Sequence, residues 1–229
     1  MTMRDRIDVI RESIEAAKLK CGRTDTVHLM GVSKTHPYDA VCEAVSSGLF
    51  LFGENRVQEI QKKFPDNRNG FELHLIGHLQ SNKVKKAVAS VDAIDSIDSL
   101  RLATLVSNEA EKLGKVIPVL IEWNTSEEES KSGFSDFSEY LMLLEASAQL
   151  PGIEINGLMT IGPLTENETQ VRTAFAKLRE IGEKSKQKFP NIDFSTLSMG
   201  MSQDYHWAIQ EGSTMVRIGT ALFGGRDYS

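Results

Sequence analysis

The stretch VHLMGVSK, residues 27–34, is a short apolar run that ends on a primary amine. Asp25 and Pro37 flank it, and runs of this length are typical of fully buried strands in parallel sheets. We therefore expect Lys34 to have its stem in the core and its amine at the strand end. Burial lowers the pKa of such an amine, and a neutral amine can attack an aldehyde to form a Schiff base. The run alone also allows, and even favours, a lysine that only reaches out to solvent.

Seven further apolar runs follow the first, and segments with helical periodicity separate them along the chain. This alternation indicates a (β/α)8 TIM barrel, formed by residues 1–229 as a single α/β domain, rather than an open doubly wound sheet. The strands are expected at 27–34, 49–52, 73–76, 92–97, 116–123, 153–161, 195–199 and 214–218. The helices between them are expected at 38–47, 55–64, 80–89, 99–113, 136–149, 167–189 and 203–211.

An additional helix is predicted before the first strand. Residues 3–20 place Ile7, Ile10, Ile14 and Leu19 among charged residues at helical spacing, which indicates an amphipathic helix. At 229 residues the barrel would be compact, since this fold typically takes about 250.

The composition limits where the protein works and what it binds. Hydrophobic residues make up 40% of the chain, no stretch is long enough to span a membrane, and the first residues lack the apolar core of a signal peptide. Cys21 and Cys42 show neither a disulfide pattern nor metal-ligand spacing, so a reducing cytoplasm is the expected location. The net charge of −6 argues against broad binding to nucleic acid or to anionic membranes.

The loops after the seventh and eighth expected strands suit a phosphate group. Barrels of this class often bind phosphate there, where backbone N–H groups and hydroxyls meet an anion. Ser202 follows the seventh strand, and Gly219 and Thr220 follow the eighth. Each loop alone has a simpler explanation, since Ser202 could only cap its helix and Gly219 could only turn the chain. The two loops together favour a phosphate site.

Five sequence blocks carry a resemblance to a known family. In chain order they are GVSKT (31–35), FGENRVQE (52–59), HLIGHLQSNK (74–83), LSMGMS (197–202) and GSTMVRIGTALFG (212–224). They resemble blocks of the pyridoxal phosphate homeostasis proteins, a family similar to the N-terminal barrel domain of alanine racemase. The resemblance covers nearly the whole chain. It implies that pyridoxal 5'-phosphate, the vitamin B6 cofactor, binds as a Schiff base on Lys34.

The same resemblance implies roles for other residues. Arg217 would face the pyridine nitrogen, where an arginine, which only donates hydrogen bonds, favours an unprotonated ring and a weak electron sink. Asn55 would suit the ring hydroxyl, although it could equally cap the helix expected from Arg56. Met199 could line the ring face, yet methionine at a strand end is more often core filler.

Other candidate residues give weaker support for a functional role. His74 and His78 are spaced i, i+4 but lack the glutamate of a zinc-protease helix, so metal hydrolysis is rejected, and His74 is expected to pack on its strand. Lys131 lies in a block that also matches the family and hints at a ligand role; a solvated lysine paired with Glu129 is the stronger interpretation. No dinucleotide, Walker or nucleophile-elbow motif occurs in the sequence.

Two functions remain. The first is a homeostasis protein that holds pyridoxal phosphate and passes it to apo-enzymes, without turnover of its own. The second is a pyridoxal-phosphate-dependent amino-acid racemase of low activity. Racemisation needs acid/base groups on both faces of the substrate carbon, and alanine racemase takes its second group from an additional C-terminal domain that we expect to be absent here. The sequence therefore favours a carrier, expected as a monomer or weak dimer.

Overall fold

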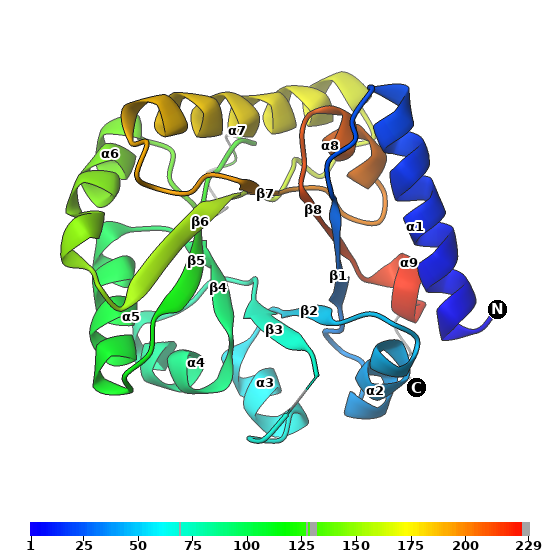
Figure 1. Ribbon diagram of the computed structural model, residues 1–229, viewed down its shortest axis with the longest axis horizontal. Helices are drawn as coiled ribbons and strands as arrows, with labels where there is room; N and C mark the ends of the chain where they lie inside the picture. The colour runs from blue at the N-terminus through cyan, green and yellow to red at the C-terminus, as the bar shows by residue number, and fades with distance from the viewer. Residues whose placement is uncertain (69, 127, 129–131, 226–229) are drawn as a thin grey trace.

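The computed structural model describes residues 1–68, 70–126, 128 and 132–225. Within these residues, eight parallel strands form a closed barrel in chain order, with β8 paired back to β1 (Figure 1). The predicted (β/α)8 architecture is thereby confirmed. The strands are β1 (His28–Val32), β2 (Leu51–Glu54), β3 (Glu72–Leu75), β4 (Ala93–Ile97), β5 (Ile117–Glu122), β6 (Ile153–Met159), β7 (Thr196–Ser198) and β8 (Met215–Ile218).

Helices surround the barrel and pack their apolar faces against the outside of the strands (Figure 1). They are α1 (Met3–Lys20), α2 (Tyr38–Ser46), α3 (Val57–Lys63), α4 (Val84–Ser90), α5 (Leu100–Lys112), α6 (Phe137–Ala146), α7 (Glu168–Lys188), α8 (Tyr205–Gln210) and α9 (Thr220–Phe223). Two short 3-10 turns, η1 (Ser81–Lys83) and η2 (Ser147–Gln149), lie next to α4 and α6. Among the described residues, none of the helices combines the length and the apolar character needed to cross a bilayer.

The additional N-terminal helix is present and spans the predicted residues. Thr2 and Asp5 form a reciprocal capping box, which satisfies backbone N–H groups at the start of α1. The helix lies beside α8 and α9 (Figure 1). Its buried residues are Met3, Ile7, Ile10, Ile14, Ala17 and Lys18. Leu19 is 77% exposed, so its predicted place on the apolar face is wrong: the 3.6-residue period carries it round to the solvent side.

The inside of the barrel has an apolar layer and a polar layer. Met30, Val32, Ile76 and Met215 form a buried cluster separate from the core under the helices. Side chains alternate between the two faces of a strand, so Arg217, two residues after Met215, also faces the interior. The polar layer therefore lies toward the carboxyl ends of the strands, where the loops of a TIM barrel assemble active sites.

Three strand boundaries differ from the prediction near the site. β1 ends at Val32, so Lys34 belongs to the following turn rather than to the strand. β2 begins at Leu51 rather than residue 49, because Gly48, with φ of 92°, ends the turn after α2 and residues 49–50 lead the chain back to the barrel. β2 also continues two residues past its predicted end at residue 52, so Glu54 lies inside the strand and Asn55 is the first residue beyond it.

Candidate functional site

Lys34 sits in a tight turn that is held at its base. The backbone N–H of Ser33 donates to the Gly53 carbonyl of β2 at 3.3 Å, and the Ser33 carbonyl accepts from the His36 N–H at 3.0 Å. Lys34 and Thr35 are the central residues of this four-residue turn, and Lys34 is half-buried. Thr35 has φ of 68°, the region that a type II turn requires at its third position. The lysine is thus presented by a defined backbone rather than by a loose loop.

A buried ion pair lies directly against this turn. Lys63, at the end of α3, donates to Glu54 Oε1 at 2.6 Å and to the Ser33 carbonyl at 2.7 Å. The Ser33 hydroxyl donates to the same Glu54 oxygen at 2.6 Å. Burial lowers the pKa of Lys63 below its usual value, although the neighbouring Glu54 carboxylate acts in the opposite direction. The sequence pattern does not indicate Lys63, because its contact with Ser33 joins residues 30 apart in the chain.

The loops after β7 and β8 do come together. The Ser202 hydroxyl oxygen accepts from the Ala221 N–H at 3.4 Å, which brings Ser202 next to Gly219 and Thr220 at the start of α9. Gly219 also packs on β1: a Cβ built there would lie 3.3 Å from the Val32 carbonyl oxygen. The hydroxyls and N–H groups of these loops therefore gather close to the end of β1, two residues before Lys34.

The alternative role for Ser202 as a helix cap is wrong. The N-cap of α8 is Asp204, two residues later, and its carboxylate accepts from the Met201 N–H at 2.5 Å. This bond closes the loop after β7 on itself, so the Ser202 side chain reaches toward α9 instead. Thr220 is exposed and Ser202 half-buried, which leaves both hydroxyls accessible to a ligand.

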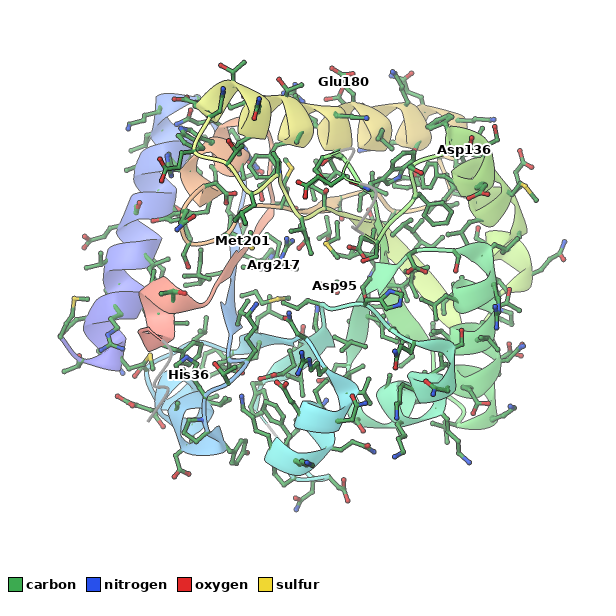
Figure 2. The ribbon with its side chains drawn as sticks, turned by 180° about the vertical axis from the view of Figure 1, so that it is seen from behind. His36, Asp95, Asp136, Glu180, Met201 and Arg217 are labelled. Atoms are coloured by element: carbon green, nitrogen blue, oxygen red, sulfur yellow. The ribbon has the colours of Figure 1, made fainter. Side chains whose placement is uncertain are left out.

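Arg217 of β8 is buried and bonds to Ser198 of β7 and to Thr160, the residue after β6. It is 4% exposed; its Nη1 donates to the Ser198 carbonyl at 2.8 Å and to the Ser198 hydroxyl at 2.7 Å, and its Nη2 donates to the Thr160 carbonyl at 2.7 Å. Figure 2 shows Arg217 near the centre of the ring of strands, with Asp95 close by in the same view. Burial lowers the pKa of Arg217 from its ordinary value, and nearby carboxylates oppose that shift. The guanidinium is therefore fixed in place inside the barrel.

His74 and Asp95 form a second charged contact in the interior. His74 Nδ1 lies 2.9 Å from Asp95 Oδ1, so the expected packing of His74 on its strand is confirmed together with a hydrogen bond. Burial alone would lower the pKa of His74, but Asp95 and Glu72 raise it to about 10. His78 is exposed and pairs with Asp98 at 3.0 Å. No group of metal-ligating side chains occurs within the parts of the chain that the structure describes.

Glu122, at the end of β5, is a further group that the motifs did not reveal. It is 3% exposed, and its Oε2 atom is buried with no hydrogen-bond partner among the residues that the structure describes. Burial and the nearby Asp98 carboxylate raise the pKa of Glu122 to about 7, against a smaller opposing effect of the Ser132 hydroxyl. A signal existed in the sequence, since an acidic residue interrupts the otherwise apolar end of this strand.

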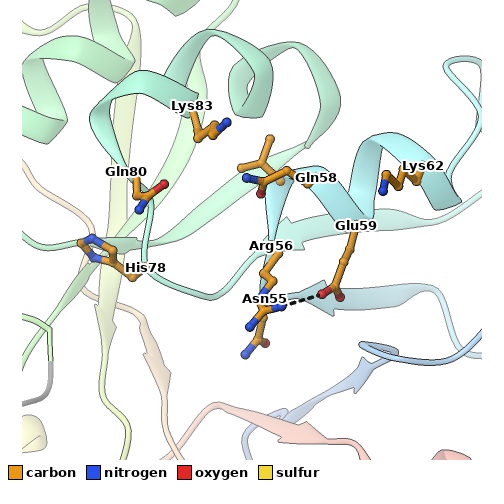
Figure 3. A pocket seen from close by; sticks show the side chains of 9 residues that line it. Asn55, Arg56, Gln58, Glu59, Lys62, His78, Gln80 and Lys83 are labelled. Atoms are coloured by element: carbon orange, nitrogen blue, oxygen red, sulfur yellow. Dashed lines mark hydrogen bonds and ion pairs between the residues drawn. The ribbon is translucent and has the colours of Figure 1, made fainter.

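Asn55 begins a polar pocket beside the barrel mouth. The pocket has a volume of about 530 Å³ and lies between the loops after β2 and β3 (Figure 3). Among the described residues, Asn55 is the one predicted cofactor residue that lines it. The alternative role of Asn55 as a helix cap is wrong, because Arg56 is the N-cap of α3. The residues lining the pocket are Asn55, Arg56, Val57, Gln58, Glu59, Lys62, His78, Gln80 and Lys83.

Two remaining predictions have different outcomes. Met199 is fully buried in the large core cluster, as expected for the alternative in which it only fills the core. Its contact with the ring of a cofactor stays a prediction. Lys131 lies outside the described residues, so the structure gives no position for its predicted role.

The donors at the mouth match the chemistry of a phosphorylated aldehyde. The Ser202 and Thr220 hydroxyls and adjacent N–H groups are suited to phosphate oxygens. The Arg217 guanidinium can donate to a ring nitrogen, and the Lys34 amine can attack a carbonyl. Gly219 allows the loop after β8 to lie close to β1, because a side chain there would meet the Val32 carbonyl. The residues present therefore fit pyridoxal phosphate.

Comparison with known proteins gives a consistent result. A family model described as the N-terminal domain of alanine racemase matches residues 6–227. The pyridoxal phosphate homeostasis protein of Vibrio alginolyticus is 42% identical over 237 residues, which cover 100% of this chain and 99% of the relative. The protein of that name from Escherichia coli K12 is also 42% identical, over 96% of this chain and 95% of the relative.

Solved structures extend the comparison. The structure of PipY of Synechococcus elongatus PCC7942 without PLP has a TM-score of 0.88 and 35% identity, covering 97% of this chain and 100% of PipY. PipY with PLP bound has a TM-score of 0.85, 34% identity and the same coverage of both chains. Alanine racemase of Clostridium difficile 630 has a TM-score of 0.74 but only 14% identity, and this chain covers 57% of it. That likeness shows the fold alone.

Proposed function

Because this chain belongs to the pyridoxal phosphate homeostasis protein family, we propose that it binds pyridoxal 5'-phosphate through Lys34 and releases it to other proteins. The observation that carries the proposal is the position of the Lys34 turn, which leaves β1 close to the point where Gly219 packs on Val32. An amine and a phosphate-binding loop at that spacing suit one ligand that bears both an aldehyde and a phosphate. PipY, at 34% identity, has been solved with PLP bound.

Each part of the cofactor has a proposed partner. Lys34 attaches to the aldehyde, while Ser202, Gly219 and Thr220 hold the phosphate. Arg217 faces the ring nitrogen, Asn55 the ring hydroxyl and Met199 the ring face. When bound, the cofactor supplies an aldehyde that an amine attaches to reversibly, which suits both storage and release.

The chemistry of Arg217 favours a carrier over an enzyme. An arginine donates hydrogen bonds and does not accept a proton from the ring nitrogen, so the ring stays a weak electron sink. The bonds to Ser198 and Thr160 hold the guanidinium in this role. The relatives described above are named for homeostasis, whereas the likeness to alanine racemase is distant. We place the exchange in the cytoplasm, where the exposed thiols of Cys21 and Cys42 would remain reduced.

A parallel assay tests the proposal. The protein is loaded with pyridoxal phosphate, freed of excess cofactor, and mixed either with an apo-enzyme that requires the cofactor or with L-alanine. The expected result is a gain of activity in the apo-enzyme and at most trace formation of D-alanine. A turnover number of about 1 s⁻¹ or more with L-alanine lies in the ordinary enzyme range and would establish a racemase instead. Failure of the apo-enzyme to gain activity would contradict release.

A further inference from the structure

We propose that the Glu54–Lys63 ion pair positions Lys34: it holds the turn of residues 33–36 so that the lysine amine meets the cofactor aldehyde. This inference rests on the proposed function and deepens it, by assigning the pair a task in forming the covalent bond. Lys63 acts through the turn, so it is a positioning residue rather than a ligand.

The contacts of the pair meet at one residue of the turn, Ser33. Lys63 Nζ lies 2.7 Å from the Ser33 carbonyl oxygen, which also accepts from His36 N–H, so both lone pairs of that oxygen are engaged. The Ser33 hydroxyl lies within reach of both members, at 2.6 Å from Glu54 Oε1 and 3.1 Å from Lys63 Nζ. The residue immediately before Lys34 is therefore fixed at its carbonyl and at its side chain.

Stability of the fold does not by itself explain this arrangement. Glu54 is fully buried and the Lys63 side chain is 11% exposed, so both charges lose most of their hydration. A buried ion pair of this kind is often no more stabilising than an apolar pair of the same size. Its second carboxylate oxygen, Glu54 Oε2, is buried without a hydrogen-bond partner among the described residues, which adds to the cost. What the pair does provide is a fixed position for Ser33.

The turn needs such support because its backbone is unfavourable. Thr35 has φ of 68°, and a β-branched residue in this region is an outlier that persists only when its surroundings hold it. On the other side, the His36 ring stacks on Phe223 of α9, with centroids 5.2 Å apart. The turn is thus held from β2 and α3 by the ion pair, and from α9 by the stacked ring.

Binding of two ligands separates positioning from general stability. Pyridoxine 5'-phosphate keeps the ring and the phosphate but has an alcohol in place of the aldehyde, so it cannot bond covalently to a lysine. The ratio of its Kd to that of pyridoxal phosphate measures what the Lys34 bond contributes to affinity. We expect Lys63→Met to lower this ratio about tenfold or more, while the Kd for pyridoxine phosphate changes by less than about twofold.

Companion variants sharpen the test. Glu54→Gln should lower the ratio in the same direction, and Lys63→Arg should restore part of it, since a guanidinium can still bond the carboxylate and the carbonyl. Lys86→Met changes an exposed lysine on the neighbouring helix α4, outside the pocket that Asn55 lines, and should leave the ratio at the wild-type value. An unchanged ratio in Lys63→Met, or an equal loss of affinity for both ligands, would overturn the positioning role while leaving the proposed function intact. A wild-type ratio near one would overturn both.

Discussion

Thr35 adopts a backbone conformation that ordinary residues avoid, and it does so next to the lysine proposed to carry the cofactor. Residues held at positive φ cost about 1–3 kcal/mol, and they cluster at sites where geometry matters for function. The position accepts glycine without that cost. At the scale of single residues, the site therefore gives up some stability to fix the direction of Lys34.

This cost can be measured with Thr35→Gly. Relief of the strained φ, less the greater flexibility that glycine gives the unfolded chain, should raise the free energy of unfolding by about 1 kcal/mol. Urea denaturation of the protein without cofactor gives the value. Thr35→Ala keeps a Cβ atom and is the control that should show no such gain. A Thr35→Gly variant less stable than wild type would show that the Thr35 side chain contributes more than its backbone costs.

The phosphate loops make a second prediction at this scale. Ser202→Ala removes one hydroxyl that would bond the phosphate, and such a charge-assisted bond is worth about 1.5–3 kcal/mol, or roughly tenfold to a hundredfold in Kd. Equilibrium titration with pyridoxal phosphate measures the change. Ser138→Ala, on the exposed start of α6, is the control. If pyridoxal without its phosphate bound wild type as tightly as pyridoxal phosphate does, no phosphate site would exist in these loops.

At the scale of elements, alternating strand and helix patterns located the barrel well. The first helix spans the expected residues, and the described strands lie within or close to their predicted ranges. Short elements are harder to predict. Helix α9 has four residues, too few to show a helical period. The predicted start of β2 is two residues early, because Leu49 extends the apolar run before the strand begins. A run of apolar residues indicates which residues are buried. Buried residues continue beyond the last paired residue of a strand, so the run does not mark where the strand begins or ends.

The sequence predicts the residues of the candidate site only where they lie in recognisable sequence blocks. Lys34, Ser202 and Arg217 stand in blocks shared with the family, so the sequence indicated them and the structure brings their loops to one end of the barrel. The Lys63 contact with Ser33 was not predictable, because it depends on how α3 packs over β1 and β2. Side-chain pairs between distant elements leave no local pattern in the chain.

The end of β5 carries a pH-dependent prediction. Folding raises the pKa of Glu122 to about 7, so the folded protein keeps a proton that the unfolded chain releases at lower pH. The resulting stabilisation is complete below the ordinary glutamate pKa and is lost as pH rises through about 7. Glu122→Gln removes this dependence, so its stability relative to wild type should rise between pH 5 and pH 8, by at most about 3 kcal/mol.

Urea denaturation at the two pH values checks this expectation. Glu145→Gln replaces an exposed carboxylate on α6 and serves as the matched control. A difference between Glu122→Gln and wild type that stays constant from pH 5 to pH 8 would show that Glu122 does not hold the proton in the folded state.

At the scale of the whole molecule, barrel closure brings the first and last strands together. β1 pairs with β8 in parallel, with Met30 opposite Arg217 and Gly31 opposite Ile218. The lysine turn after β1 and the proposed phosphate loop after β8 are thereby neighbours, although Lys34 and Gly219 are 185 residues apart in the chain. Helix α1 covers this closure from outside: Arg6 donates to the Leu222 carbonyl, and Tyr205 of α8 donates to Ser13. The proposed cofactor site thus depends on closure of the barrel.

The most direct test is to trap the bound cofactor. The protein loaded with pyridoxal phosphate is reduced with borohydride, digested, and mapped by mass spectrometry, with Lys34→Ala treated in parallel. We expect the reduced adduct on the peptide that contains Lys34, and its loss in Lys34→Ala. An adduct found mainly on Lys63, Lys83 or Lys131, or no adduct in the wild-type protein, would contradict the assignment of Lys34 as the residue that holds the cofactor.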